Sequence, residues 1–244
     1  MALGPDRRFT LRTDTMTPAE ARAADIDVGL RAYMLRVYNY MASGLALTGL
    51  VAAGVAHSDA AMQAIFGTGL VWVLFIAQIG LVFFLSARIQ AMKAGTAQAL
   101  YWAYSGLMGL TLSAIFLQFT GASITRVFFI TAGTFAAMSL YGYSTKRDLS
   151  GFGSFLFMGL IGIVIAGIVN IFLASSALHF VISVVGVLVF TGLTAYDTQA
   201  IKSIYTESDE SEVHDKKAIL GALRLYLDFI NIFILLLQFF GDRR

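Results

Sequence analysis

Cysteine is absent from this sequence of 244 residues, and charged residues make up only 13% of it. Without cysteine the chain can form no disulfide, no thiolate zinc site and no thiol nucleophile. A soluble domain of this length carries about a quarter charged residues. Apolar residues make up 58% and the mean hydropathy is +0.76, more apolar surface than water can hold in solution. The composition therefore predicts a protein of the lipid bilayer.

Proline is almost as scarce, because the only two, Pro5 and Pro18, both lie in the polar N-terminal region. No long apolar run contains a proline, so we expect spans without a proline kink. The first thirty residues hold no apolar segment of a secretory signal, and the first apolar run is expected to direct insertion itself. We expect a polar cytoplasmic tail over residues 1–30 and a single transmembrane domain over residues 31–244.

Seven apolar runs are long enough to cross a hydrocarbon core about 30 Å thick, which takes roughly 20 helical residues. In lipid only helices and closed barrels satisfy every backbone polar group, and these runs lack the alternation of barrel strands. The predicted fold class is an all-α integral membrane protein with seven transmembrane helices. The approximate runs are Val37–His57, Thr68–Ser86, Gln98–Phe119, Val127–Tyr143, Phe152–Ala174, Ala177–Tyr196 and Leu223–Phe240.

Lysine and arginine are divided unevenly between the two ends of these spans. The positive-inside rule places the richer end in the cytoplasm. We therefore expect a cytoplasmic N-terminus and, after seven spans, a C-terminus outside. One end carries Arg7, Arg8, Arg12, Arg22, Arg88, Lys93, Lys146, Arg147, Lys202, Lys216 and Lys217, and the other carries Arg126, Arg243 and Arg244.

The longest predicted connection runs from Ile201 to Ala222 on the cytoplasmic side. It is rich in acids, and we interpret it as a solvated loop or, alternatively, as a surface that weakly attracts cations. The acids are Glu207, Asp209, Glu210, Glu212 and Asp215.

Small residues recur at every fourth position in three spans. Such stripes let helix backbones approach closely, which matters because lipid supplies no hydrophobic drive between helices. We expect all three stripes to lie at helix contacts. They are Ser105, Gly109 and Ser113; Gly133 and Ala137; and Gly162 and Ala166.

Two aspartates stand out, because an ionisable group within a span costs roughly 2.5–3.5 kcal/mol on insertion scales. Asp228 lies inside the seventh run, and Asn231 shares its helix face. Asp197 lies at the cytoplasmic end of the sixth run. Since the last two spans are antiparallel neighbours, we expect both carboxyl groups at similar depth in the cytoplasmic half.

Two carboxylates held close in a low dielectric cannot both ionise readily, so such a pair shares a proton. This predicts a pH-sensing gate that a shared hydrogen bond closes and full ionisation loosens. The alternative is that each aspartate pairs elsewhere, since Arg224 lies four residues before Asp228, the spacing of an intrahelical ion pair. Arg88, at the cytoplasmic end of the second span, either snorkels to the interface or is a further partner of the aspartates.

Motifs of catalysis and of nucleic-acid binding are missing. His57, His179 and His214 lack metal-ligand spacing, and no phosphate loop, dinucleotide loop or nucleophile elbow is present. No basic stripe suits nucleic acid. An intramembrane aspartyl protease is disfavoured, because no glycine precedes either aspartate directly. We expect no catalytic residue, cofactor or metal-ligand set, and hence no enzyme.

Four segments carry a resemblance to a known family. They are Ser139–Ser150, Val169–Phe172, Thr191–Gln199 (TGLTAYDTQ) and Leu225–Phe233 (LYLDFINIF). Through them nearly the whole chain after the tail resembles the Bax inhibitor-1 family, also called the transmembrane Bax inhibitor motif family. The simple loops look like those of a bacterial, inner-membrane member. The resemblance implies a central seventh helix with the other six around it.

The resemblance also implies a pH-sensitive calcium leak, with calcium as the transported ion and Asp197 and Asp228 as the pH-sensing pair. Arg88 matches the family's second-span arginine approximately, and Gln78 stands in a span where some relatives carry an acid. The alternative implied by some bacterial relatives is a modulator of a membrane-anchored ATP-dependent quality-control protease. The N-terminal tail or the long cytoplasmic loop would then carry the contact.

Overall fold

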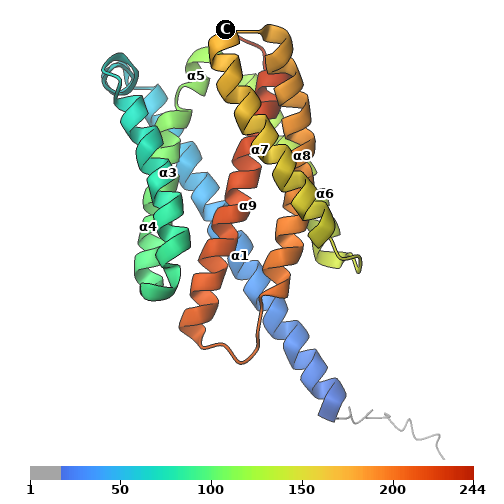
Figure 1. The fold of residues 1–244 in the computed structure, drawn as a ribbon. Coiled ribbons are helices and arrows are strands. Elements are labelled where there is room, and N and C mark those ends of the chain that lie inside the picture. Colours follow the sequence, from blue (N-terminus) through green and yellow to red (C-terminus); the bar gives the residue numbers. More distant parts are fainter. Residues whose placement is uncertain (1–17) are drawn as a thin grey trace, which may run out of the picture.

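The computed structural model describes residues 18–244, with side chains from Asp27 onward (Figure 1). Seven helical stretches in this part are long and apolar enough to cross a membrane, which confirms the predicted fold class. The long helices are α1 (Pro18–Ala56), α3 (Leu70–Arg88), α4 (Ala94–Leu112), α6 (Gly121–Ser144), α7 (Ser150–Leu173), α8 (Ser176–Ser203) and α9 (Ser211–Phe240). Two single turns, α2 (Asp59–Met62) and α5 (Ile115–Gln118), follow α1 and α4. The tail arginines Arg7, Arg8 and Arg12 lie outside the described residues.

Helix α1 begins at Pro18, well before the predicted first span at Val37. Proline suits the first position of a helix, where its missing N–H would have no partner. The extra turns are held in place because Tyr33 and Met34 are buried in the core. Hydropathy missed them because charged residues such as Arg36 interrupt the apolar run.

The predicted long loop over Ile201–Ala222 is wrong. Helix α8 continues to Ser203 and α9 already begins at Ser211, so only residues 204–210 connect them. Three of the five acids of this stretch lie in this connection, whereas Glu212 and Asp215 lie on the first turns of α9, where Asp215 forms an ion pair with Arg36 of α1. Side chains paired in this way extend a helix beyond the apolar stretch that hydropathy detects.

Helix α9 lies between two groups of helices, with α3 and α4 on one side and α6, α7 and α8 on the other (Figure 1). It packs on α1, α4, α6 and α8, whereas α3 packs mainly on α4 and α7 mainly on α8. Its most apolar stretch is 67% buried, against at most 39% for any other span. The last helix is therefore the most buried, with α3 and α7 in outer positions.

Of the three small-residue stripes, the one through Gly109 lies at a close helix contact. A methyl group at Gly109 would lie 2.7 Å from the carbonyl oxygen of Thr48, so α1 and α4 approach closely there. Gly133 and Gly162 are exposed and meet no neighbouring helix, so the expectation is wrong for those two positions. The close approach of α6 to α8 lies instead at Gly142, where a methyl group would overlap the α8 backbone.

The two ends of the bundle carry different termini. The start of α1 and the α8–α9 connection lie at one end, and the C-terminus lies at the other (Figure 1). The C-terminal residues are fastened there, because the carbonyl of Asp242 accepts from the backbone N–H of Thr120 at 3.0 Å. The Asp242 carboxylate also accepts from Arg126 of α6 at 3.0 Å.

Candidate functional site

Asp228 lies on the buried side of α9, with only 4% of its surface exposed. Its Oδ2 atom has no hydrogen-bond partner among the described residues. The neighbouring Tyr226 and Phe229 are buried as well, so the helix cannot turn the carboxyl group out of the bundle. A buried ionisable group without full partners is costly, and its retention within a span points to a functional role.

Asp197 of α8 faces Asp228 across the contact between the last two helices. Its side chain is 17% exposed, and both aspartates line the same cavity between α7, α8 and α9. The structure therefore brings together the two aspartates that the sequence singled out. Two carboxylates this close repel each other, and the contact is favourable when they share one proton.

Arg224 pairs with a different residue from the one its sequence spacing indicates. Its Nη1 atom lies 4.0 Å from Oδ1 of Asp197 on α8, and no ion pair with Asp228 is present in the described part of the chain. The guanidinium is half exposed, so the attraction is modest. Arg224 therefore connects α9 to α8 at the edge of the carboxyl pair.

A cavity of about 780 Å³ opens beside the pair, between α7, α8 and α9. Asp197, Asp228 and Arg224 line it together with Asn231, whose Nδ2 donates to the carbonyl of Leu227 on its own helix at 2.8 Å. A second cavity of about 440 Å³ lies between α3, α4 and α9. Asn231 and Leu227 line both cavities, so they form the boundary between them.

Arg88 is not part of this cluster. It ends α3 with an exposed side chain, and no hydrogen bond or ion pair joins it to either aspartate in the residues that the structure describes. Of the two alternatives for Arg88, the position favours a side chain that extends toward the membrane surface.

A hydrogen-bond network behind Asp197 was not predicted from the sequence. The next residue, Thr198, bonds through its hydroxyl to Ser139 of α6 at 2.9 Å, and Ser139 bonds to the hydroxyl of Tyr38 of α1 at 2.6 Å. These bonds tie α8 to two other helices directly beside the carboxyl pair. Thr198 and Ser139 both lie in segments that carry the family resemblance, which was the available signal for them.

The following residues of α8 hold the turn between α6 and α7. The side-chain amide of Gln199 accepts from the backbone N–H of Leu149 at 2.8 Å and donates to the carbonyl of Arg147 at 2.8 Å. One helical turn on, Lys202 donates to the carbonyl of Tyr143 at 2.8 Å. Together these bonds fix the C-terminal half of α8, and hence the position of Asp197.

The opposite face of α9 is anchored through Tyr226. Its hydroxyl lies 2.6 Å from Oγ1 of Thr48 on α1, and Thr48 lies 2.8 Å from the carbonyl oxygen of Ser105 on α4. The ring also makes edge-on contacts with Tyr101 and Tyr104. Helix α9 is therefore held firmly on one face, and the carboxyl pair lies on the other.

Within the described residues, no group of three or more histidine, aspartate and glutamate side chains is placed to hold a metal ion. Ca²⁺ favours about six to eight oxygen ligands. The aspartate pair offers two carboxyl groups, so it can contact a passing cation but does not build a tight calcium site.

Comparison with known proteins agrees with this architecture. The sequence profile of the family described as "Inhibitor of apoptosis-promoting Bax1" matches residues 30–244. The chain is 53% identical over 219 residues to the inner membrane protein YbhL of Escherichia coli K12, which covers 88% of this chain and 94% of the relative. It is 47% identical over 232 residues to the protein RP147 of Rickettsia prowazekii, covering 95% and 98%. These matches and the seven-helix fold identify the chain as an integral membrane protein of the Bax inhibitor-1 family.

Proposed function

We propose that this protein is a passive, pH-sensitive calcium leak gated by Asp197 and Asp228. The observation that carries the proposal is the buried Asp228 carboxyl group, which lines the same cavity as Asp197 while its own Oδ2 lacks a partner among the described residues. An acid that served packing alone would be expected to be fully hydrogen-bonded. The resemblance to family members with a paired-aspartate pH sensor supports the same reading.

The gate works through the charge of three groups. With one proton shared, the two aspartates carry a single negative charge, which the guanidinium of Arg224 balances at 4.0 Å. When that proton leaves, two carboxylates face each other in a low dielectric and repel. The repulsion acts across the α8–α9 contact and loosens it beside the 780 Å³ cavity.

Calcium is the substrate in this proposal and not a resident cofactor, and we expect no enzymatic activity. Conduction requires binding that is favourable enough for entry and weak enough for release. Two carboxylates and the amide oxygen of Asn231, all on the cavity wall, match that requirement better than a full coordination shell would.

The membrane in question is the bacterial inner membrane, with the N-terminus in the cytoplasm and the C-terminus outside. The Escherichia coli relative is named as an inner membrane protein, which supports this location. The distribution of lysine and arginine supports the orientation.

The second candidate function is modulation of a membrane-anchored ATP-dependent quality-control protease. It is favoured by one feature of the fold, the start of α1, which projects beyond the bundle at the proposed cytoplasmic end (Figure 1). Deletion of the residues before Asp25 should then abolish capture of the protease while the bundle stays folded. Capture that survives the deletion would exclude the tail as the contact.

The test of the leak is calcium entry into liposomes that contain a calcium indicator, measured between about pH 6 and 8, because the protons of a coupled carboxyl pair leave in two separate steps. Wild type is compared with Asp197→Asn and Asp228→Asn. The control is Asp242→Asn, because Asp242 is an exposed aspartate at the opposite end of the molecule, paired with Arg126.

The proposal expects a protein-dependent flux whose pH response disappears in both site variants and persists in Asp242→Asn. If folded, inserted wild-type protein gives no flux above empty liposomes, the leak is excluded and the protease candidate becomes the stronger one. A flux whose pH response survives in Asp228→Asn would retain the leak but exclude the aspartates as its gate.

A further inference from the structure

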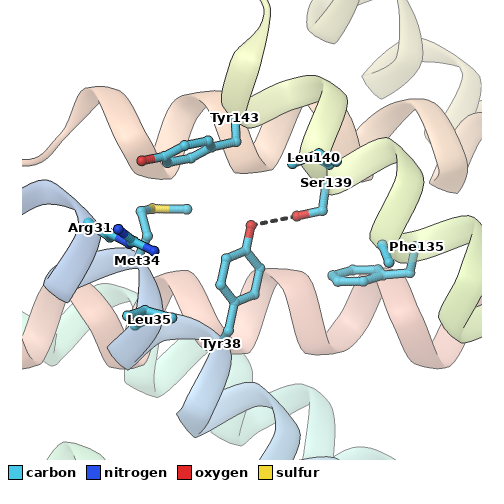
Figure 2. Close-up of a pocket in the computed structure, with 9 residues that line it drawn as sticks. Arg31, Met34, Leu35, Tyr38, Phe135, Ser139, Leu140 and Tyr143 are labelled. Atoms are coloured by element: carbon cyan, nitrogen blue, oxygen red, sulfur yellow. Dashed lines mark hydrogen bonds between the residues drawn. The ribbon is translucent and has the colours of Figure 1, made fainter. Parts of the chain in front are cut away.

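A lipid-facing groove separates α1 from α6. Both helices pack on α9, but they hardly pack on each other. At the end of the bundle where α1 begins, the groove deepens into a cavity of about 380 Å³ (Figure 2). A group of the size of a water molecule occupies ~30 Å³, so this volume holds about a dozen such groups. That is enough room for much of an acyl chain.

The cavity combines an apolar wall with a cationic end. Met34 and Leu35 of α1 line one side and Phe135 and Leu140 of α6 line the other, while the guanidinium of Arg31 lies at the end toward the start of α1 (Figure 2). Arg31 is the only charged residue among the described residues that line this cavity.

Two hydrogen bonds organise the wall of the cavity. The hydroxyl of Tyr38 crosses the groove to Ser139 at 2.6 Å (Figure 2). Ser139 is fixed in turn to Thr198 of α8 at 2.9 Å. A preformed apolar pocket with a few placed polar groups is the usual form of a small-molecule site. These bonds therefore fix the position of α1 relative to α6 at the cavity.

The other half of the same groove provides an internal comparison. A cavity of about 350 Å³ lies there between α1, α6 and α9, and no charged side chain lines it. The difference between the two cavities is therefore one of charge, not of apolar surface. A ligand with a negative headgroup and a long apolar tail fits the first cavity and gains no headgroup contact from the lining of the second.

We propose that the cavity around Arg31 is a binding site for an anionic phospholipid, with the phosphate at the guanidinium of Arg31 and an acyl chain between α1 and α6. Basic pockets between transmembrane helices at the cytoplasmic side bind acidic headgroups in this way. The site is separate from the carboxyl pair, and it stands whether or not the protein conducts calcium.

The test measures lipid binding to the purified full-length chain in detergent by native mass spectrometry. Phosphatidylglycerol and phosphatidylcholine with identical acyl chains are titrated against wild type, Arg31→Ala and Arg88→Ala. Arg88 is the matched control, because it is an exposed arginine at the same end of the bundle but on α3. A fourth variant, Ala136→Phe, fills the cavity from α6 without a change of charge.

We expect wild type to prefer phosphatidylglycerol, and Arg31→Ala to lose about fivefold in its affinity, the effect of one basic residue at a membrane surface. Arg88→Ala should keep the preference, and Ala136→Phe should weaken binding of both lipids. Inorganic phosphate at equal concentration should not compete. Equal binding of the two lipids to wild type, an equal loss in Arg31→Ala and Arg88→Ala, or competition by phosphate alone would overturn the proposal.

Discussion

Arg224 of α9 approaches Asp197 of α8, with 4.0 Å between Nη1 and Oδ1, although Asp228 lies one turn along its own helix. The guanidinium therefore acts across the helix contact, where it favours the ionised form of the carboxyl pair. We expect Arg224→Gln to move the midpoint of the pH response of calcium flux to higher pH. The shift should stay below about one pH unit, because half-exposed ion pairs contribute at most ~1 kcal/mol.

The conservative variant Arg224→Lys separates charge from geometry. Lysine keeps the positive charge, so the midpoint should return most of the way to the wild-type value when flux is measured in the same liposomes. If Gln and Lys variants shift the midpoint equally, the role of Arg224 is one of shape or packing and not of charge.

Gly142 sets how closely α6 and α8 can approach, because a methyl group there would overlap the backbone at Ala195. We expect Gly142→Ala to push the helices apart and to lower the free energy of unfolding by about 1–3 kcal/mol, as overpacking does. The matched control is Gly133→Ala on the same helix, where no neighbouring atom lies within 4 Å. That change should be neutral or stabilising, because alanine favours a helix.

Thermal unfolding of the purified protein in one detergent compares these two glycine variants. Equal losses in both would mean that the contact between α6 and α8 does not limit stability. If Gly133→Ala loses less stability than Gly142→Ala, the destabilisation comes from the close approach at Gly142. That contact involves α8, the helix that carries Asp197.

Asp148 lies in the connection between α6 and α7, outside the membrane spans, and we expect it to make the stability of the protein depend on pH. Its carboxylate accepts a hydrogen bond from the backbone N–H of Ser150 at 2.9 Å, and hydrogen bonds from the Ser150 hydroxyl and N–H lower the pKa of Asp148 below its ordinary value. A lowered folded-state pKa contributes stability that is present above the unfolded pKa and is lost as pH falls through the folded pKa.

We therefore expect Asp148→Ala to be less stable than wild type at neutral pH, and the difference between the two proteins to shrink as pH falls below about 4, the ordinary range for aspartate. Chemical unfolding across this pH range measures the difference. A gap that stays constant down to acid pH would assign the effect to lost packing and not to the charged carboxylate.

The sequence predicted the seven spans and the meeting of Asp197 with Asp228, because both follow from apolar length and antiparallel order. It failed where charged residues extend a helix beyond its apolar stretch. The start of α1 and the first turns of α9 are helical because residues such as Arg36 and Asp215 pair with each other across the bundle. That pairing joins residues far apart in the chain, and hydropathy cannot register it.

The interactions around the two aspartates could not be predicted from the sequence either. Spacing along one helix indicated Arg224 with Asp228, but the arginine extends toward α8 instead. Gln199 and Lys202 bond to backbone carbonyls of the α6–α7 region, which have no residue-type signature. Side-chain direction and backbone targets are set by tertiary packing, so they emerge only from the fold.

The absence of native cysteine allows a direct test of the proposed orientation, because each introduced thiol is the single reactive group. Ser208→Cys lies in the α8–α9 connection, and Arg244→Cys lies at the C-terminus, at opposite ends of the bundle. A membrane-impermeant maleimide is applied to cells whose outer membrane has been permeabilised. We expect Arg244→Cys to react under this condition, and Ser208→Cys to react only after the inner membrane is permeabilised as well. The reverse pattern would place the start of α1, and with it the cationic cavity around Arg31, on the outer side of the membrane. If both thiols react while the inner membrane is intact, the seventh span does not cross the membrane. The seventh span is the weakest part of the predicted topology, because Arg243 and Arg244 disfavour a C-terminus outside.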